Sequence, residues 1–201
     1  MKAKRTRAQL LRAAGEVFGE CGYDGATLEA IAARAGVTRP AVNHHFATKS
    51  ALYREAVECA IVPMLDGAVT KASQPPDLAT RLSTFVVETI GSAPDDRSLA
   101  LFLVTWVLES RRHPELLPAE HDAVSASRAF VTWAVRDAIS SGELGIDTDV
   151  AGVVDMLLAM IWGIGLYSGR GTGEDSRKIL HAFELLLRTT LWHLVDTRAS
   201  G

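Results

Sequence analysis

The sequence predicts an all-helical protein, and three observations support this fold class. Apolar residues recur every three or four positions along most of the chain, which is the spacing of one face of a helix. No segment shows the strict apolar and polar alternation of a half-buried strand, and proline, glycine or aspartate separate the periodic segments. Hydrophobic residues make up 48% of the 201 residues and charged residues only 22%, so a packed core is expected.

Glycine and threonine mark the ends of the first helices. The apolar spacing predicts a helix over 6–21, and Gly22 ends it, as glycine commonly does at a helix terminus. Thr27 is placed to cap a second, short helix that ends at Gly36. Thr38 is placed in the same way to cap a third helix.

The third and fourth helices follow without a long loop. Pro40 lies in the first turn of the third helix, where a missing amide hydrogen costs no bond, and Val42 and Phe46 point to the core. Thr48 starts the fourth helix. After a proline-rich break, further periodic segments bring the total to about nine helices. We place these segments near residues 77–91, 96–112, 115–141, 147–168 and 174–195.

Charge is distributed unevenly along the chain. Residues 1–57 contain nine Lys or Arg against five Asp or Glu, a balance of +4. Residues 58–201 contain twelve against nineteen, a balance of −7, so the net charge of −3 hides a basic head and an acidic body. Local positive charge favours contact with a polyanion at that end of the molecule.

The sequence also predicts the compartment. The longest stretch without charge, 156–169, is shorter than the roughly 18 residues of a membrane span, and the amino terminus lacks the pattern of a secretion signal. Cys21 and Cys59 lie on apolar helical faces without a metal-binding spacing, so both are expected to be buried free thiols. A cytoplasmic protein is predicted.

The stretch 27–46 has the spacing of a helix-turn-helix. Ala32 is small where the two helices would cross, Gly36 supplies the positive φ of the tight turn, and Val42 packs the second helix onto the unit. A helical hairpin that merely completes a bundle is the alternative. Because the stretch lies in the basic segment, we favour DNA binding.

These residues resemble the tetracycline-repressor (TetR) family of bacterial transcriptional regulators. The likeness is close over 6–57 and loose beyond it. Its best-matched segments are 27–35, 35–37, 45–46 and 48–52, with weaker likeness at 110–116 and 140–144. The resemblance implies an N-terminal three-helix DNA-binding head over 1–57 on a larger helical bundle over 58–201, which binds ligand and dimerises.

The resemblance also implies which residues meet DNA, since in that family the third helix enters the major groove. Arg39 is the candidate for base reading, because a guanidinium can form two hydrogen bonds with a guanine edge. Pro40 lies beside it at the helix start. Thr27 and Thr38, with hydroxyls and amides at helix starts, and Lys49, with its charge, are candidates for phosphate contacts.

Asn43 and His44 depart from the family pattern, which usually has tyrosine or another aromatic residue here. Asn43 can read an adenine, and His44 can bind a phosphate when protonated; whether they contact bases or phosphates stays open. His45 is expected to be structural and to pack beside Phe46.

The last two predicted helices carry long apolar stripes. The resemblance implies a four-helix bundle between two subunits, and burial within one chain is the alternative. A dimer would place two heads about 34 Å apart, which suits a palindromic operator. The candidate interface residues are Ile161, Leu180, Phe183, Leu187 and Leu191.

The middle helices are rich in large side chains, which either form plain core or line an apolar ligand pocket with a few polar anchors. The pocket rests mainly on the resemblance. Its candidate residues are Phe102, Trp106, Glu109, Phe130, Trp133, Met156 and Met160.

Motifs of the common helical-bundle enzymes are missing. The chain has no His-Glu-x-x-His and no Gly-x-Ser-x-Gly, and the glycine-rich run 169–173 lacks the lysine of a phosphate-binding loop. Glu109 and His113 alone are too few to hold a metal. We therefore expect neither an enzyme nor a bound cofactor or metal.

The sequence thus predicts a cytoplasmic, homodimeric regulator that binds double-stranded palindromic DNA, most simply a repressor released by a small apolar ligand, without a membrane partner. A helical binding or interaction bundle whose head has lost DNA affinity is the alternative, against which the retained Arg39 and Lys49 argue. The ligand, the operator, the regulated genes and the sign of regulation stay open.

Overall fold

The protein is helical throughout the part of the chain that the structure describes. In this computed structural model, that part comprises residues 2–90, 96–116, 123–170 and 173–189. These residues form nine α-helices and one short 3-10 helix, in agreement with the predicted fold class. The elements are α1 (Lys2–Gly25), α2 (Leu28–Arg34), α3 (Arg39–His45), α4 (Lys49–Ala72), α5 (Leu78–Ile90), α6 (Asp96–Arg112), η1 (Pro114–Leu116), α7 (Ala123–Ser140), α8 (Val150–Arg170) and α9 (Gly173–Thr189).

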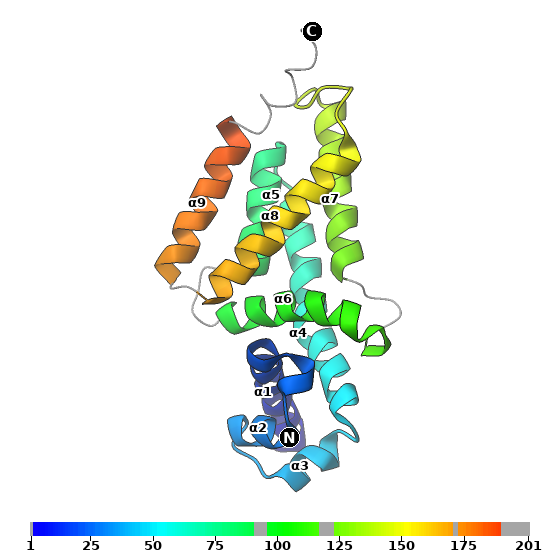
Figure 1. The fold of residues 1–201 in the computed structure, drawn as a ribbon, viewed down its shortest axis with the longest axis vertical. Coiled ribbons are helices and arrows are strands. Elements are labelled where there is room, and N and C mark those ends of the chain that lie inside the picture. Colours follow the sequence, from blue (N-terminus) through cyan, green and yellow to red (C-terminus); the bar gives the residue numbers. More distant parts are fainter. Residues whose placement is uncertain (1, 91–95, 117–122, 171–172, 190–201) are drawn as a thin grey trace.

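The molecule has a small head and a larger body (Figure 1). Helices α1, α2 and α3 form the head at one end, and α5, α7, α8 and α9 stand at the other end. Helix α6 runs crosswise between them, and α1 packs mainly against α6 and α4. Helix α4 extends from the head into the body, so the boundary predicted at residue 57 falls within one continuous helix. The division into 1–57 and 58–201 stays a prediction.

Threonine side chains cap two of the three helices that the sequence predicts to begin at a threonine. Oγ1 of Thr27 accepts a hydrogen bond from the amide of Ala30 at 3.1 Å, and Oγ1 of Thr48 accepts one from Ala51 at 3.0 Å. Both threonines have extended backbone angles, as N-cap residues do. The starts of α2 and α4 are therefore fixed by local sequence.

The third cap differs from the prediction. Thr38 occupies the N-cap position of α3, but its side chain makes no capping hydrogen bond. The amide of Ala41 bonds instead to the carbonyl oxygen of Thr38 at 3.0 Å, and Pro40 has no amide hydrogen to offer. The Thr38 hydroxyl is thus not engaged in capping.

Two glycines adopt backbone angles that other residues rarely take. Gly36 has φ +67° in the turn between α2 and α3, as predicted. Gly22 has φ +71° and ψ 176°, so α1 breaks there and then continues for three residues to Gly25. The helix predicted over 6–21 is therefore longer at both ends. It begins at Lys2, and one more turn follows the break.

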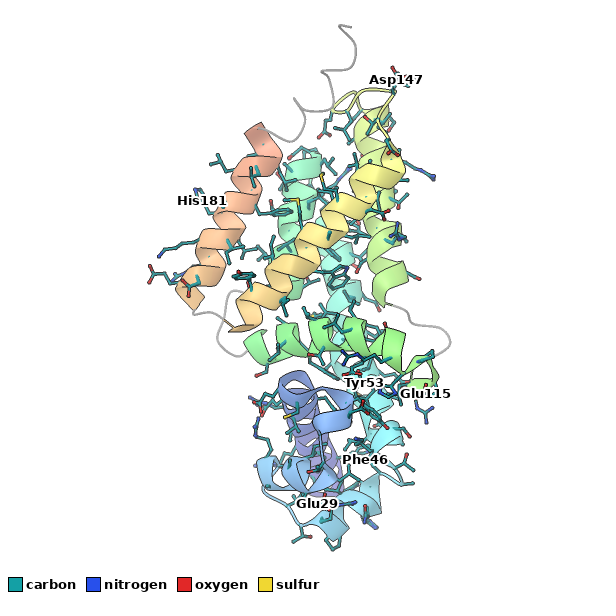
Figure 2. The ribbon with its side chains drawn as sticks, viewed as in Figure 1. Glu29, Phe46, Tyr53, Glu115, Asp147 and His181 are labelled. Carbon is teal, nitrogen blue, oxygen red and sulfur yellow. The ribbon has the colours of Figure 1, made fainter. Side chains whose placement is uncertain are left out.

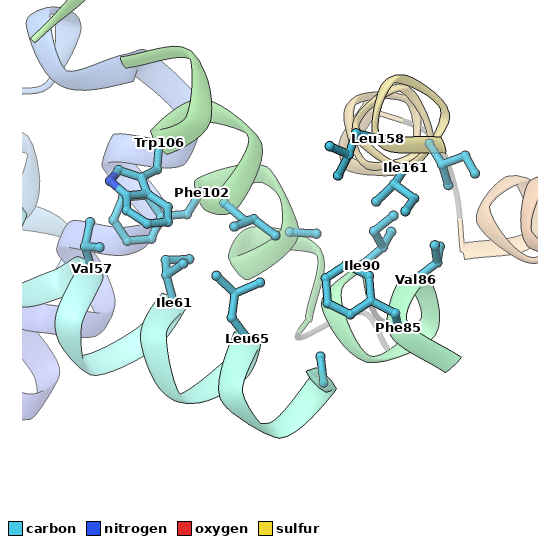
Figure 3. Packing of buried hydrophobic residues seen from close by; sticks show 14 of the residues in the cluster. Val57, Ile61, Leu65, Phe85, Val86, Ile90, Phe102, Trp106, Leu158 and Ile161 are labelled. Atoms are coloured by element: carbon cyan, nitrogen blue, oxygen red, sulfur yellow. The ribbon is translucent and has the colours of Figure 1, made fainter. Parts of the chain in front are cut away.

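A continuous apolar core joins the head to the body (Figure 3). Helix α4 supplies one side of it and packs against α1, α5 and α6, while α8 packs against α6 and α5. The labelled core residues in Figure 3 are Val57, Ile61, Leu65, Phe85, Val86, Ile90, Phe102, Trp106, Leu158 and Ile161. The body therefore holds the head through packed side chains as well as through the chain itself.

Both cysteines are exposed, so the prediction that they are buried was wrong. Cys21 lies at the end of its apolar stripe, beside the break at Gly22. Cys59 lies on a side of α4 where α1 and α6 leave an open cleft. Helical periodicity placed each thiol on an apolar face, but the edge of such a face stays uncovered when no neighbour reaches it.

One helix is long and apolar enough to cross a membrane by composition. The segment Val150–Ser168 of α8 has a mean hydropathy of 1.9, and a third of it is buried inside the fold. Because Asp155 lies within this segment, the longest uncharged stretch of the sequence, 156–169, covers only part of it. Helix α8 packs against α6, α7 and α9, and a core helix of a helical bundle has the same composition.

Candidate nucleic-acid interface and effector site

Helix α3 lies at the outer end of the head, on the side away from the body (Figure 1). Val42 and Phe46 are buried and hold its inner face against the head. Asn43 and His44 are exposed on the outer face, and His45 is half-buried with its ring 6.4 Å from that of Phe46. His45 thus lies beside Phe46 as expected, and its structural role stays a prediction.

Arg39 is held by two neighbours on this outer face. Its Nε donates to Oε1 of Glu29 at 2.8 Å, and its Nη1 donates to Oδ1 of Asn43. The hydrogen bond from Arg39 holds the pKa of Glu29 below its usual value. Arg39 and Asn43, one helical turn apart, therefore form a preorganised pair of hydrogen-bonding side chains facing outward.

Glu29 was not predicted as part of this site. It lies in the first turn of α2, at the same end of the molecule as Phe46 (Figure 2). A carboxylate here repels DNA phosphates unless a cation neutralises it, and Arg39 does so. Glu29 lies ten residues before Arg39 and on a different helix, so helical spacing in the sequence does not connect the two residues.

Thr27 and Thr38 are both exposed at helix starts, as a phosphate contact requires. Oγ1 of Thr27 accepts a bond from Ala30, which leaves its own proton available to donate. Pro40 is exposed beside Arg39 at the start of α3. These assignments stay predictions.

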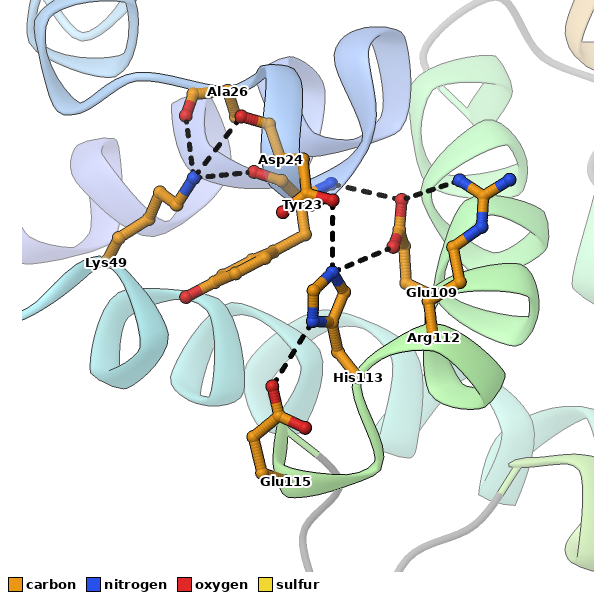
Figure 4. Close-up of polar contacts among 8 residues, drawn as sticks. All are labelled: Tyr23, Asp24, Ala26, Lys49, Glu109, Arg112, His113 and Glu115. Carbon is orange, nitrogen blue, oxygen red and sulfur yellow. Dashed lines mark hydrogen bonds and ion pairs between the residues drawn. The ribbon is translucent and has the colours of Figure 1, made fainter.

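Lys49 is placed differently from its predicted role. Its Nζ donates to the carbonyl oxygens of Tyr23 at 2.8 Å, Ala26 at 3.1 Å and Asp24 at 3.5 Å, and it lies 4.4 Å from the centre of the Tyr23 ring (Figure 4). A phosphate would have to compete with these three acceptors. In this geometry Lys49 fastens α4 to the negative end of α1, and its phosphate role stays a prediction.

Arg7 is a second basic residue that sequence reasoning missed. Its guanidinium lies 5.2 Å from the centre of the Phe46 ring and forms an ion pair with Glu55. Its side chain is 45% exposed, at the end of the head where α3 lies. Arg7 therefore connects α1, α3 and α4 and adds positive charge beside α3.

Glu109 joins the head to the body instead of anchoring a ligand in an interior pocket. Its carboxylate is buried, and Oε1 accepts a hydrogen bond from the amide of Tyr23 at 3.3 Å and lies 4.0 Å from Nη1 of Arg112 (Figure 4). Its Oε2 has no hydrogen-bond partner. Burial, and the charge of Glu109, raise the pKa of the neighbouring Tyr53 hydroxyl.

His113, which follows α6, forms a second link to the head. Its Nε2 lies 3.2 Å from Oδ2 of Asp24 in α1, and its Nδ1 lies 3.2 Å from Oε1 of Glu115 (Figure 4). The bond with Asp24, and then that with Glu115, raise the pKa of His113. Its Nε2 is also 3.8 Å from Oε2 of Glu109, so a protonated His113 faces three carboxylates.

Most residues predicted to line a pocket are packed core. Phe102, Trp106 and Phe130 are each at most 4% exposed. Trp133 and Met156, in contrast, are 41% and 39% exposed. Their role in a pocket stays a prediction: periodicity identifies large apolar side chains, but only packing decides whether space is left between them.

Ring contacts hold the side chains of Phe130 and Trp133 in place. The ring of Phe130 stacks on Phe85 with centroids 4.8 Å apart, and the guanidinium of Arg81 lies 4.7 Å from the centre of the Trp133 ring. Met160 is half-buried against the core.

An open cleft of about 630 Å³ lies elsewhere, between α1, α4 and α6. Phe102 alone among the predicted pocket residues lines it. The lining residues are Ala8, Leu11, Arg12, Gly15, Glu16, Ala56, Cys59, Ala60, Ser98, Leu99 and Phe102. The opening is thus formed partly by α1 of the head.

The predicted dimer residues are largely used within the monomer. Ile161, Phe183 and Leu187 are each at most 2% exposed, so they cannot form an interface between subunits. Leu180 is half-buried against the core. Leu191 lies outside the described residues.

Other apolar side chains of α8 and α9 are exposed. Leu166 and Tyr167 on α8 are 40% and 73% exposed, and Leu185 and Leu186 on α9 are 55% and 43% exposed. Both helices therefore carry apolar residues on two sides. One side packs inside the chain, and the other is exposed.

Comparisons with known proteins agree with this geometry. The sequence profile described as "Bacterial regulatory proteins, tetR family" matches residues 10–56. The chain is 30% identical to the HTH-type transcriptional repressor Rv1474c of Mycobacterium tuberculosis over 90% of each protein, and 26% identical to the HTH-type transcriptional regulator UidR of Escherichia coli over 81% of each. The fold is also similar to that of AibR, solved in complex with isovaleryl coenzyme A and operator DNA, with a TM-score of 0.67, 19% identity and coverage of 89% of this chain and 96% of AibR.

Proposed function

The chain belongs to the tetR family of bacterial regulatory proteins, and we propose that it is a homodimeric repressor that releases its operator when a small molecule binds. The observation that carries this proposal is the outer face of α3. Arg39 and Asn43 are presented outward on a helix that Val42 and Phe46 fix to the head. A helix held in this way can enter a major groove as a rigid unit.

We assign roles within the head from this geometry. Arg39 reads a guanine. On binding DNA, Arg39 either releases Glu29 or keeps its hydrogen bond with Glu29, which then orients the guanidinium. Asn43 reads an adjacent base. Thr27, Thr38 and His44 contact phosphates, and these contacts set the register of the helix on DNA.

Dimerisation brings two heads to a palindrome. We propose that the exposed apolar residues of α8 and α9 form the interface, together with Leu180 at its edge. Burying Leu166, Tyr167, Leu185 and Leu186 on both subunits would remove four large exposed apolar side chains of these two helices from water.

The small-molecule part of the proposal rests on the family and on AibR, whose structure contains an acyl coenzyme A together with operator DNA. Release requires the ligand to prefer a state in which the heads fit DNA badly. We propose that this chain acts by binding alone, in the cytoplasm, where chromosomal DNA lies. A bundle whose head has lost DNA affinity is the second candidate.

Binding of the purified full chain to DNA from beside its own gene tests the proposal. Fluorescence anisotropy is measured across a salt series, with a shuffled duplex of the same composition as control. We expect tight binding to the first duplex, a steep fall with salt, and two subunits or a multiple of two per palindrome. Equal, weak binding to both duplexes at every salt would favour the second candidate.

A further inference from the structure

The cleft between α1, α4 and α6 has the size of a small-molecule site. Its volume is about 630 Å³, within the range of roughly 300–1,000 Å³ that ligand pockets occupy. Its walls come from three helices, of which α1 belongs to the head and α6 to the body. A molecule in it would therefore touch both parts at once.

Among the residues that the structure describes, the lining is mainly apolar and its charged members come from α1. Leu11 from α1 and Leu99 from α6 are half-buried and supply the apolar surface, Phe102 borders the cleft but is only 1% exposed, and alanines of α1 and α4 leave room between them. Arg12 and Glu16 are the charged residues of the lining. The chemistry suits a molecule with an apolar body and one charged group.

Arg12 determines the sign of that charge. Its side chain is 77% exposed and meets Glu16 through Nε at 3.4 Å. Glu16 also pairs with Arg34 at 3.2 Å, and Arg34 pairs in turn with Glu20 at 2.8 Å. Arg12 meets this cluster through Nε alone, so an anionic group on a ligand can bond its Nη1 and Nη2 edge.

The cleft adjoins a close contact between head and body. A Cβ atom added at Gly19 would lie 3.0 Å from the amide nitrogen of Phe102, and one added at Gly15 would lie 3.3 Å from its ring. Helices α1 and α6 thus meet at Phe102 through two glycines, and Phe102 and Gly15 also line the cleft. A ligand there presses on the joint that sets the angle of the head.

We propose that this cleft is an effector site for an apolar small molecule with one anionic group, and that its occupation changes the orientation of the head relative to α6. The apolar body lies among Leu11, Leu99 and Phe102, and the anionic group lies on Arg12. This inference deepens the proposed function and depends on it for its regulatory consequence, but binding to the cleft can be tested without DNA.

Two matched fluorescent probes test the chemistry. The probe 8-anilinonaphthalene-1-sulfonate has an aromatic body and one anionic group, and N-phenyl-1-naphthylamine is the same body without the charge. We expect both to bind the full chain. Arg12→Gln should weaken the anionic probe about threefold to fivefold and leave the neutral probe unchanged. Equal weakening of both probes, or none, would overturn the role of Arg12.

Filling the cleft with a large side chain is a second test of the proposal. Ala60 lines the cleft on α4, so Ala60→Trp should lower the affinity of both probes at least tenfold. Ala129→Trp, at an exposed position of α7, is the control for a bulky surface residue. Equal probe binding by these two variants would place the probes elsewhere and overturn the proposal.

The two exposed cysteines allow a test on the unaltered chain. Cys59 lines the cleft and Cys21 does not. Saturating probe should slow alkylation of Cys59 by iodoacetamide at least fivefold and leave Cys21 unchanged, as measured by mass spectrometry of peptides. Unchanged rates at both thiols would overturn the proposal. Protection of Cys59 that grows with protein concentration in the absence of probe would mean that a second copy covers the cleft.

Operator binding distinguishes failure of this inference from failure of the proposed function. The anionic probe should change operator affinity at least threefold in the unaltered chain, and in Arg12→Gln the same change should require about threefold to fivefold more probe. Operator binding that ignores a probe shown to occupy the cleft would overturn the effector role alone. Absence of operator binding would overturn the proposed function and leave the cleft site standing.

Discussion

The amide nitrogen of Tyr23 donates a hydrogen bond to Oε1 of Glu109 over 3.3 Å and so ties the last turn of α1 to α6. Gly22 makes this bond geometrically accessible, because its φ of +71° breaks the helix one residue earlier and turns the Tyr23 amide toward the carboxylate. Lys49 and His113 hold the same end of α1 through Asp24 and its neighbours. The head is therefore joined to the body by polar contacts at one end of α1 and by Phe102 near its middle.

Gly22→Ala should destabilise the protein by about 1–3 kcal/mol, because the residue would adopt a strained φ and its Cβ would lie 2.7 Å from Oε1 of Glu109. Urea unfolding followed by circular dichroism measures the change. Gly67→Ala in α4, where an added Cβ meets nothing within 4 Å, is the control and should be neutral or slightly stabilising. Equal effects at both glycines would contradict the close contact with Glu109.

The link between His113 and Asp24 predicts a pH dependence of stability. The folded-state pKa of His113 is raised, so the stabilisation by its charged form is fully present below its unfolded value of about 6.5 and is lost as pH rises through the folded pKa. Urea unfolding at a series of pH values should show this loss in the unaltered chain but not in His113→Gln. His181→Gln, at an exposed position of α9 (Figure 2), is the control and should keep it.

Lys49→Met should lower the free energy of unfolding by about 1–2 kcal/mol, because three carbonyl oxygens and the Tyr23 ring lose their cation. The salt dependence of operator binding should stay the same, because Lys49 is not a phosphate contact in this geometry. The exposed Lys71→Met, which removes an ion pair with Glu88, is the control for loss of a surface charge. A flatter salt dependence with unchanged stability would restore the phosphate role.

Arg39→Ala should weaken operator binding by about 1–3 kcal/mol and relax base preference at one position, because a bidentate contact to guanine is lost. Anisotropy with single-base operator variants measures both effects. Arg128→Ala, an exposed arginine of α7 paired with Asp155, is the control. Uniform weakening over all base variants would instead make Arg39 a phosphate contact.

Charge placed on the exposed face of α8 and α9 should dissociate the dimer. Tyr167→Glu and Leu186→Glu are each expected to raise the dimer dissociation constant by at least tenfold, as measured by sedimentation velocity. Ile146→Glu, at an 89% exposed position in the turn before α8, should have no effect. A dimer that tolerates both charges would require an interface elsewhere.

The sequence by itself determined the features that depend on residues close in the chain. Thr27 and Thr48 cap their helices through amides three residues away, and Gly36 takes its positive φ within a tight turn. The helix-turn-helix and its outward Arg39 follow from these short-range constraints. Such interactions are fixed by local geometry and therefore leave a signal in the spacing of residues.

Only the tertiary structure decided which apolar face of α9 packs inside. Phe183 and Leu187 are buried while Leu185 and Leu186 are exposed, although all four are large apolar residues of one helix. In the same way, Lys49 meets Tyr23 from 26 residues away and Glu109 meets it from 86 residues away. These partners are chosen by how the helices pack, and helical periodicity specifies the faces of each helix without specifying which neighbour covers them.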